Sequence, residues 1–393
     1  MGGVSMEWKE DVLGNVLEVK YGKDHKKLAD GQYPVYGSGG LMRYVDSKLY
    51  DGPSILIPRK GTLNNIMFVE SPFWTVDTMF WSIINTDKVD PKFLFYSICK
   101  RDFASMNVGS AVPSMTVNIL NDIQISYPKN IEDQRRIASI LSSLDRKIEL
   151  NNKINADLEE MAQAIFKNWF VDFEPFKDGK FVDSELGMIP EGWKVGKITD
   201  IGCLITDYVS NGSFASLKQN VHLYETKEYA QFIRNTDLKT NTFSVYVDKH
   251  SYDFLSKSTL YGNEIIISNV GDVGSVHLCP KLDIPMTLGN NIIMLRPNEK
   301  EYNYFLYLWF KYFSGQALIQ GIKGGSAQPK FNKTDFKNLP LLIPSFEIIE
   351  RSYWIFESMF SILSSNVKEN SRLSLLRDTL LPRLISGEIE VPE

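Results

Sequence analysis

The chain has 393 residues, a formal net charge of −5 at pH 7 and 43% hydrophobic residues, enough for two or three domains with cores of their own. No apolar run approaches the roughly 18 residues that span a bilayer, and the N-terminus lacks the apolar core of a signal peptide, so we expect a cytoplasmic protein with no membrane partner. Three scattered cysteines, Cys99, Cys203 and Cys279, lack metal-ligand spacing and fit a reducing compartment. The mild acidity, taken alone, argues against a nucleic-acid binder. Lysines and arginines outside the acidic helical stretches nevertheless leave room for basic faces.

Residues 1–130 predict a mixed α+β module. The segments DGPSILIPRKG (51–61) and TVDTMFWSI (75–83) have the β-branched, alternating residues of strands, set between Gly and Pro turns. FLFY (93–96) belongs to an aromatic helical segment, and GSAVPSMTVNILNDIQISYP (109–128) closes the module with a run that turns from polar to apolar.

Residues 131–172 predict one long helix. Its seam residues recur at steps that alternate between four and three, which is a heptad pattern. They are Ile137, Leu141, Leu144, Ile148, Asn151, Asn155, Leu158, Ala162, Ile165 and Trp169. At roughly 1.5 Å per residue, such a helix is about 60 Å long and needs a partner to bury the seam.

Residues 173–192 are rich in Gly, Pro and Asp and read as a linker. Residues 193–345 then repeat the first module. The segments YGNEIIISNVG (261–271), TLGNNIIML (287–295), FLYL (305–308) and GSAQPKFNKTDFKNLPLLIP (325–344) match those above at shifts of 210, 212, 212 and 216 residues. Between Trp193 and Gly262 the second copy has no clear match, so we expect divergence or insertions there.

Residues 346–386 predict a second long helix, followed by a tail at 387–393. Its seam follows the first at a shift of 215 residues: Ser352, Phe356, Met359, Leu363, Asn366, Asn370, Leu373, Arg377, Leu380 and Leu384. A seam asparagine fixes register because a buried amide needs a partner. Antiparallel packing would pair Asn151 with Asn370, Asn155 with Asn366, Ile148 with Leu373 and Leu158 with Leu363.

This register leaves two imperfections, Arg377 opposite Leu144 and Ser352 opposite Trp169. The alternative, two unrelated helices that each pack on their own domain, does not account for the asparagines that recur at a constant shift. The predicted fold class is therefore α+β, with two repeated mixed α/β domains separated by two long helices that pack as an antiparallel coiled coil.

The order of these parts resembles the specificity subunits of type I restriction-modification systems. The motifs that carry the resemblance are IEDQRRIASILSSLDRKIELNNKI (131–154), AIFKNWFVDFEPF (164–176), IPEGWKV (189–195) and LLPRLISGEIEV (380–391). The second helix departs from the pattern, since it begins FEIIERSYWIF (346–356). The resemblance implies that each module is a target recognition domain for one half of an asymmetric, bipartite double-stranded DNA sequence. It further implies that the helices act as a ruler, and that two methyltransferase subunits and restriction subunits are partners that carry the catalysis.

The sequence offers no catalytic signature of its own. The four histidines form no HExxH cluster, the Gly-rich stretches GSGG (37–40) and NVGDVG (269–274) are not phosphate-binding loops, and no G-x-S-x-G or Asn-Pro-Pro-aromatic motif occurs. We expect no catalytic residue, no metal ligand and no cofactor. The second hypothesis for the function is a coiled-coil scaffold that binds only protein, and the third is a nucleic-acid enzyme.

Candidate DNA contacts are polar and basic residues in module loops, because Lys and Arg reach phosphates and polar side chains reach base edges. The candidates are Lys23, Lys26, Lys27, Arg59, Lys60, Lys100, Arg101 and Ser110 in the first module, and Lys218, Arg234, Lys239, Asn269, Lys323, Ser326 and Lys330 in the second. For each of them, a solvated surface side chain is the alternative. Lys60 and Lys323 are the stronger candidates because they flank glycines in loops that the repeat places at nearly equivalent positions.

Overall fold

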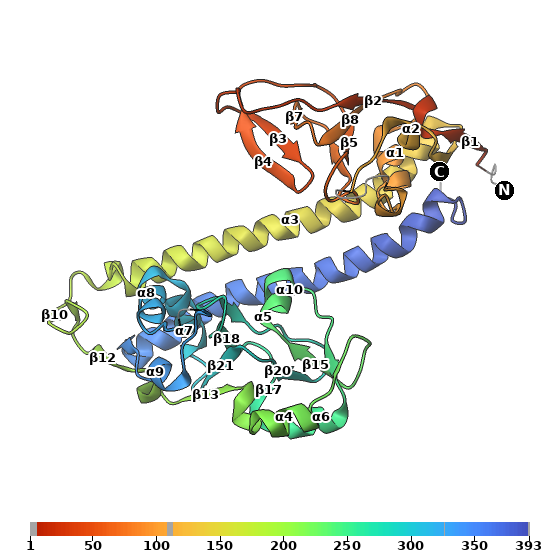
Figure 1. Cartoon of the computed structure of the whole chain (residues 1–393). Coiled ribbons are helices and arrows are strands. Elements are labelled where there is room, and N and C mark those ends of the chain that lie inside the picture. The colour runs from red at the N-terminus through yellow and green to blue at the C-terminus, as the bar shows by residue number, and fades with distance from the viewer. Residues whose placement is uncertain (1–5, 108–112, 326, 392–393) are drawn as a thin grey trace, which may run out of the picture. The chain divides into compact units, whose positions relative to one another are not determined.

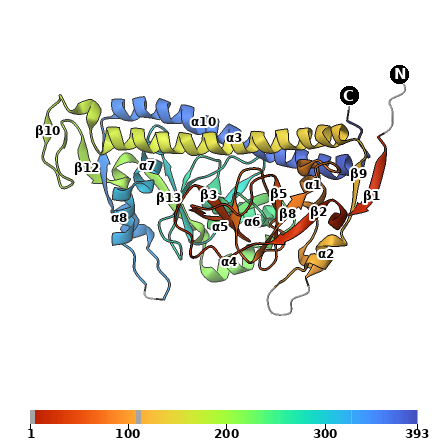
Figure 2. The same ribbon diagram turned by 90° about the horizontal axis from the view of Figure 1, so that it is seen from above.

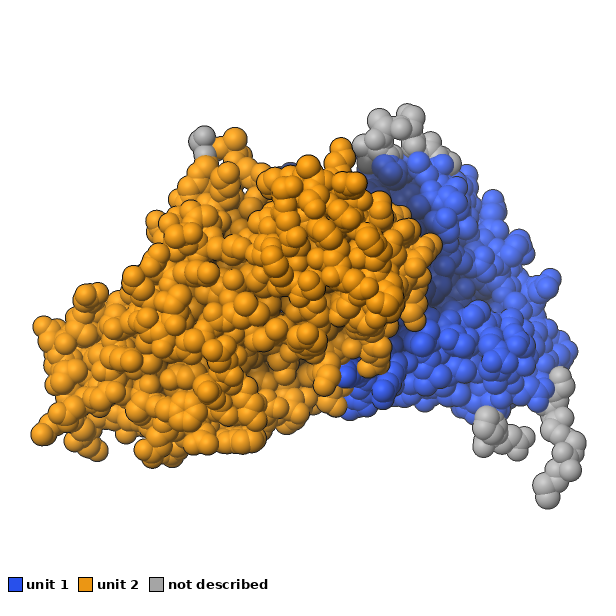
Figure 3. All heavy atoms as spheres, turned by 90° about the horizontal axis from the view of Figure 1, so that it is seen from below, with its two compact units in different colours: residues 1–151, 368–393 blue, residues 152–367 orange. Residues whose placement is uncertain are grey.

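A computed structural model describes residues 6–107, 113–325 and 327–391, and the chain divides into two compact units. The first unit comprises residues 1–151 and 368–393, and the second comprises residues 152–367 (Figure 3). Each unit therefore contains one module and a segment of each long helix.

The two long helices are α3 (Ile131–Phe170) and α10 (Phe346–Ile385), each of 40 residues. Asn130 precedes α3 and accepts a hydrogen bond from the N–H of Glu132 at 3.0 Å, which satisfies a donor at the helix start. Carboxylates in the first turn, Glu132 and Asp133 in α3 and Glu347 in α10, suit the positive end of the helix dipole. Within each unit, segments of α3 and α10 lie side by side and run in opposite directions (Figures 1 and 2).

The first module contains three sheets. The four-stranded sheet has the order β2-β8-β5-β6, the three-stranded sheet has the order β4-β3-β7, and β1 pairs with β9. All neighbours are antiparallel except β3 and β7. The strands are β1 (Trp8–Val12), β2 (Leu17–Tyr21), β3 (Tyr33–Gly37), β4 (Gly40–Val45), β5 (Ser54–Pro58), β6 (Met67–Val69), β7 (Trp74–Thr75), β8 (Met79–Ile84) and β9 (Gln124–Pro128).

The second module repeats this topology. Its four-stranded sheet has the order β13-β21-β18-β19, its five-stranded sheet has the order β14-β16-β15-β20-β17, and β12 pairs with β22. The strands are β12 (Lys194–Lys197), β13 (Cys203–Asp207), β14 (Leu223–Tyr224), β15 (Ala230–Ile233), β16 (Tyr246–Val247), β17 (Thr259–Leu260), β18 (Ile265–Ser268), β19 (Val276–Leu278), β20 (Met286–Leu288), β21 (Ile292–Pro297) and β22 (Pro340–Ile343). Here β15 and β20 form the parallel pair, so Phe232 lies opposite Thr287 as Tyr36 lies opposite Thr75.

The segment between Trp193 and Gly262, which has no clear sequence match to the first module, thus supplies strands in equivalent places. β13, β15 and β16 take the positions of β2, β3 and β4. A β-ladder is made by backbone groups, so the same pairing can persist while the side chains change. This segment also inserts three helices that have no counterpart between β2 and β5: α4 (Phe214–Asn220), α5 (Asn235–Thr240) and α6 (Lys249–Phe254).

Two helices recur in both modules: α1 (Pro91–Ile98) corresponds to α7 (Tyr302–Lys311), and α2 (Val117–Asn121) corresponds to α9 (Lys333–Lys337). The second module adds α8 (Phe313–Gly321), which has no α-helical counterpart among the described residues of the first. Thr116 caps α2 and Asn332 caps α9, both with a side-chain oxygen that accepts a backbone N–H. α1 packs against β5, β6 and β9, whereas α7 packs against β18, β19 and β21.

Short 3-10 helices complete the chain: η1 (Leu13–Asn15), η2 (Ala104–Met106), η3 (Glu174–Phe176), η4 (Ile198–Ile201), η5 (Tyr208–Asn211) and η6 (Ser256–Ser258). The linker carries η3 and a small antiparallel hairpin of β10 (Phe181–Val182) and β11 (Ile189–Pro190).

The ends of the long helices belong to the module cores. In the first unit, Ile137 and Leu141 of α3 and Leu384 of α10 are buried in one cluster with Phe93 of α1. In the second unit, Phe166 and Phe170 of α3 and Phe356 of α10 are buried in one cluster with Phe305 of α7. The long helices therefore have two roles, since their ends bury apolar side chains against a module and their middle parts contact each other.

Candidate nucleic-acid interface and helix pair

The stretch GSAVP (109–113) recurs as GSAQP (325–329), and we call it the GSAxP motif. The proline of the first copy, Pro113, is hydrogen-bonded to the loop that follows strand β5. The N–H of Gly61 donates to the carbonyl oxygen of Pro113 at 3.2 Å, and the N–H of Met115 donates to the carbonyl oxygen of Arg59 at 2.9 Å. These two bonds fasten the segment after residue 112 to the loop that carries Arg59 and Lys60.

The second module contains the same pair of bonds. The N–H of Gly271 donates to Pro329 at 2.9 Å, and the N–H of Phe331 donates to Asn269 at 3.0 Å. The shift is 210 residues on one side of the clip and 216 on the other, as in the sequence repeat. The repeated motif therefore builds the same loop-to-strand clip in both modules.

Each clip glycine has a backbone conformation that disfavours a side chain, with φ of +89° at Gly61 and +78° at Gly271. An alanine at 271 would have free space around its Cβ but would keep the unfavourable backbone. We expect Gly271→Ala to lower the free energy of unfolding by about 1–2 kcal/mol, measured by urea denaturation. Gly39→Ala is the control, because Gly39 has equal space and no positive φ; an equal loss in both variants would contradict the role of backbone strain.

Some predicted DNA contacts lie at these clips. Arg59 and Lys60 border the first clip, and the guanidinium of Arg59 lies 5.3 Å from the ring of Tyr21 while its Nη1 donates to the carbonyl oxygen of Asp77. Asn269 takes part in the second clip, and Lys330 lies between its residues Pro329 and Phe331. Lys330 and Gly324 exchange backbone hydrogen bonds of 2.8 and 2.9 Å. This exchange also brings Lys323 close to the second clip.

Other predicted contacts have intramolecular partners. Lys100 pairs with Asp378, Arg101 donates to the carbonyl oxygen of Gln124, Arg234 pairs with Asp237, and Lys239 pairs with Asp272. By contrast, the exposed side chains of Lys27, Lys60, Lys218 and Lys323 make no hydrogen bond or ion pair with any described residue. Lys23 and Lys26 lie in the exposed loop after β2. Ser110 and Ser326 lie outside the described residues.

Sequence reasoning missed two residues at the clips. Tyr21 carries the ring beneath Arg59, and Asp272, next to Gly271, holds Lys239 at 2.5 Å and accepts from Asn235 at 3.3 Å. Asp272 lies within the Gly-rich stretch NVGDVG (269–274). Tyr21 could not have been identified from the sequence, because no local pattern connects residue 21 with residue 59.

The helix pair contains the two asparagine contacts. In the first unit, the Nδ2 of Asn151 donates to the Oδ1 of Asn370 at 2.8 Å and to Glu369 at 2.8 Å. In the second unit, the Nδ2 of Asn366 donates to the Oδ1 of Asn155 at 2.9 Å. Asn151 is fully buried. The apolar seam residues beside them, Ile148, Leu158, Leu363 and Leu373, are half-buried.

The asparagine pair of the second unit can be tested by comparing single and double variants. Asn366→Leu leaves the amide of Asn155 without its partner, so we expect a loss of about 1–2 kcal/mol in the free energy of unfolding. The double variant Asn155→Leu with Asn366→Leu should recover this loss, or have a higher free energy of unfolding than the unsubstituted protein, because apolar seam pairs are more stable than polar ones. Urea denaturation of the three proteins measures both effects, and a double variant weaker than the single one would contradict the pairing.

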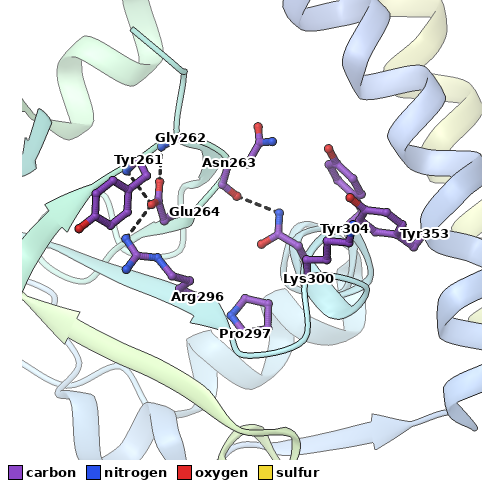
Figure 4. A pocket seen from close by; sticks show the side chains of 10 residues that line it. Tyr261, Gly262, Asn263, Glu264, Arg296, Pro297, Lys300, Tyr304 and Tyr353 are labelled. Carbon is purple, nitrogen blue, oxygen red and sulfur yellow. Dashed lines mark hydrogen bonds and ion pairs between the residues drawn. The ribbon is translucent and has the colours of Figure 1, made fainter. Parts of the chain in front are cut away.

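A pocket of about 260 Å³ in the second unit shows how its ionisable groups are engaged (Figure 4). The carboxylate of Glu264 accepts from the N–H groups of Tyr261 and Gly262, both at 2.8 Å, and from Arg296 at 2.7 Å. The guanidinium of Arg296 lies 4.8 Å from the ring of Tyr261. Three donors occupy this carboxylate, so it serves the turn at 261–264 rather than proton transfer.

The described residues give no sign of a metal or a reactive thiol. Among residues 6–107, 113–325 and 327–391, no group of three or more His, Cys, Asp or Glu side chains could hold a metal ion. Burial raises the pKa of Cys99 to about 11 and that of Cys203 to about 12, and it raises the pKa of Cys279 well above its ordinary value. These thiols stay protonated near neutral pH and are poor nucleophiles. In the same residues, no helix combines the length and apolarity needed to cross a membrane.

Two modules of one topology, each joined to segments of two antiparallel long helices, define a class of duplicated two-module proteins. The chain belongs to the family described as type I restriction modification DNA specificity domain, whose model matches residues 6–160 and 190–373. The predicted family and the predicted fold class are confirmed.

Curated relatives agree with this assignment. The chain is 28% identical over 395 residues to the MjaIX specificity subunit of a type I restriction enzyme from Methanocaldococcus jannaschii, with 94% of this chain and 86% of the relative covered. It is 26% identical over 398 residues to the HindI specificity subunit from Haemophilus influenzae, with 82% and 83% covered. A solved S subunit of a type I restriction-modification system from M. genitalium has the same fold, with a TM-score of 0.65, 17% identity and 97% of each chain covered.

Proposed function

We propose that this chain is the DNA sequence-recognition subunit of a type I restriction-modification complex in the cytoplasm. Each module reads one half of a bipartite double-stranded target, and the helix pair holds the two readers apart. The chain itself carries no catalytic residue, and it brings methyltransferase and restriction subunits to the target. Domain limits of 1–130 and 193–345 for the readers, with 131–172 and 346–386 for the helices, follow from this proposal.

The repeated clip is the observation that carries the proposal. The same backbone bonds carry different side chains, Arg59 and Lys60 in one module and Asn269 and Val270 in the other. The amide of Asn269 is turned inward and donates to the carbonyl oxygen of Phe331 at 3.4 Å, whereas Lys60 is exposed. Clips with unlike surfaces suit unlike half-sites, because sequence is read by the side chains that reach base edges. The exposed side chains of Lys27, Lys60, Lys218 and Lys323, which bind no described residue, suit phosphate contacts, which position a protein without reading sequence. The target is therefore asymmetric.

Fluorescence anisotropy with the chain alone and with its methyltransferase subunit tests the proposal. We expect tight binding to one asymmetric sequence, falling as salt rises, with a salt dependence reduced by about one unit in Lys60→Ala. Lys180→Ala in the linker is the matched control and should leave the dependence unchanged. No sequence-specific binding under any condition would reject the proposal and favour a scaffold that binds only protein.

A further inference from the structure

An arginine occupies a position of the helix seam where an apolar residue is expected. Arg377 does not point at Leu144 as a misfit; its Nη1 lies 2.7 Å from the Oδ1 of Asp145 on α3. Both side chains are partly buried, with Arg377 23% and Asp145 27% exposed. The first unit thus contains a directional ion pair between its helix segments.

The same aspartate binds the first module. Its second oxygen, Oδ2, accepts a hydrogen bond of 2.6 Å from the hydroxyl of Tyr96 on α1. Burial, and then the bond to Asp145, raises the pKa of Tyr96, so the hydroxyl remains a donor at neutral pH. Arg377 also pairs with Asp378 at 2.9 Å, and Asp378 pairs with Lys100 just beyond α1 at 3.2 Å. We name the chain of contacts Tyr96–Asp145–Arg377–Asp378–Lys100 the first joint.

Four members of the first joint, Tyr96, Lys100, Asp145 and Arg377, line a hollow of about 410 Å³, and the ring of Tyr96 also belongs to the apolar cluster of the first unit. Apolar contacts attach the module to the helices through other residues, with Ile137 and Leu141 on α3 and Leu384 on α10. Apolar contact is not directional, whereas charge-assisted hydrogen bonds have defined distances and angles. Buried Gln134 of α3 also makes directional bonds, accepting from the N–H of Asp90 at 2.7 Å and donating to the carbonyl oxygens of Lys88 and Pro128. The joint adds the directional contacts that include α10, through Arg377 and Asp378.

The second unit has a comparable joint made from other positions. The hydroxyl of Tyr304 on α7 donates to Glu357 on α10 at 2.6 Å, and Tyr304 lies beside Tyr353 in the pocket wall (Figure 4). Lys311 at the end of α7 donates to Glu159 on α3 at 2.9 Å. The sequence repeat aligns Tyr96 with Leu308, so this tyrosine was not simply inherited by both copies. The same chemistry at different positions favours a role for the joint itself.

We infer that the first joint sets the angle of the first module on its helix pair and thereby the gap between half-sites that the protein accepts, an inference that rests on the proposed function. Tyr96 and Arg377 are positioning residues, because they act through the orientation of the module and not by touching DNA. The joint is partly exposed, so its contribution to stability is modest and its effect is on geometry.

The test measures competition between DNA targets in the reconstituted complex with methyltransferase subunits. The targets carry both half-sites with the natural gap, or with a gap longer or shorter by one base pair. We expect Tyr96→Phe to reduce the preference for the natural gap by about threefold or more, because it removes one hydrogen bond to a charged acceptor. Preference for the correct bases within each half-site should not change. Asp145→Leu combined with Arg377→Leu should reduce the preference further.

Tyr44→Phe is the matched control, since Tyr44 is 50% exposed in the first module and outside the joint. Should Tyr96→Phe keep the full gap preference, the inference is wrong while the proposed function stands. If the complex with the unsubstituted chain shows no target-specific binding at all, the proposed function itself is wrong. Tyr96→Phe decides the matter even if the double leucine variant does not fold.

Discussion

Phe170→Ala is expected to lower the free energy of unfolding of the second unit by about 3–5 kcal/mol, the usual cost of removing a buried phenylalanine ring. Phe170 is the last residue of α3 and is 1% exposed. Its ring centroid lies 4.9 Å from that of Phe305, 5.3 Å from Phe166 and 5.9 Å from Trp193. The loss follows because the surrounding rings belong to different elements and cannot all close the cavity. Urea denaturation followed by tryptophan fluorescence measures it.

Met161→Ala on the same helix is the control. Met161 is 51% exposed, so its truncation should change the free energy of unfolding by no more than about 0.5 kcal/mol. If Phe170→Ala cost no more than Met161→Ala, the end of α3 would not be part of the core of the second unit.

Arg296→Met is expected to lower the free energy of unfolding by about 3 kcal/mol, because it leaves a buried carboxylate without its charge partner. The side chain of Glu264 is 2% exposed. In the variant it would keep only the N–H groups of Tyr261 and Gly262 (Figure 4). Urea denaturation checks this value. Adding Glu264→Gln should recover at least half of the loss, since it removes the unpaired charge and keeps an acceptor for the two N–H groups.

Arg43→Met is the matched control for this ion pair. Arg43 binds Asp30 at 2.9 Å and a backbone carbonyl oxygen at 2.9 Å, as Arg296 binds Glu264 and the carbonyl oxygen of Thr259. The two pairs differ in the acid, because Asp30 is 95% exposed. Arg43→Met should therefore cost less than about 1 kcal/mol. Equal losses in both variants would show that burial of the carboxylate does not set the cost.

The first module supports this interpretation of the Glu264 pair. The repeat places Ser54 at the position of Glu264 and Ile84 at that of Arg296. In that module the Oγ of Ser54 donates to the carbonyl oxygen of Ser82 at 2.8 Å. The same strand arrangement is thus built once with a neutral pair and once with a buried charge pair, so the fold itself does not require the charges.

The heptad spacing of apolar residues predicted most features of the two long helices. Heptad spacing is a property of neighbouring residues, so the limits near residues 131 and 170 and the antiparallel pairing were accessible from the chain. The seam included Ala162, Ile165 and Trp169 but not Phe166 and Phe170, which are fully or almost fully buried. These two face a module core and not the partner helix, and no helical period reveals which distant residues will cover a second apolar face.

The candidate interface, too, could be predicted only in part from the sequence. The recurring GSAxP motif could be recognised because it is written in consecutive residues. The hydrogen bonds that the N–H groups of Gly61 and Gly271 donate to the carbonyl oxygens of Pro113 and Pro329 could not, because they join residues more than 50 positions apart. Arg101, Arg234 and Lys239 were predicted from charge alone, yet each is engaged by another group. The partners of Arg101 and Lys239 are distant in sequence, whereas Asp237 lies three residues after Arg234 and its pairing was accessible from the chain.

The duplication, the heptad seam and its asparagines could be recognised in the order of residues, because repeats and periods are properties of that order. The tertiary structure was needed to show that the unmatched segment after Trp193 builds the same sheets, and that Arg377, a charged residue in the seam, binds Asp145. Sheet pairing is made by backbone groups common to all residues, and an ion pair forms wherever folding brings opposite charges together. Neither leaves a signature in the neighbouring sequence.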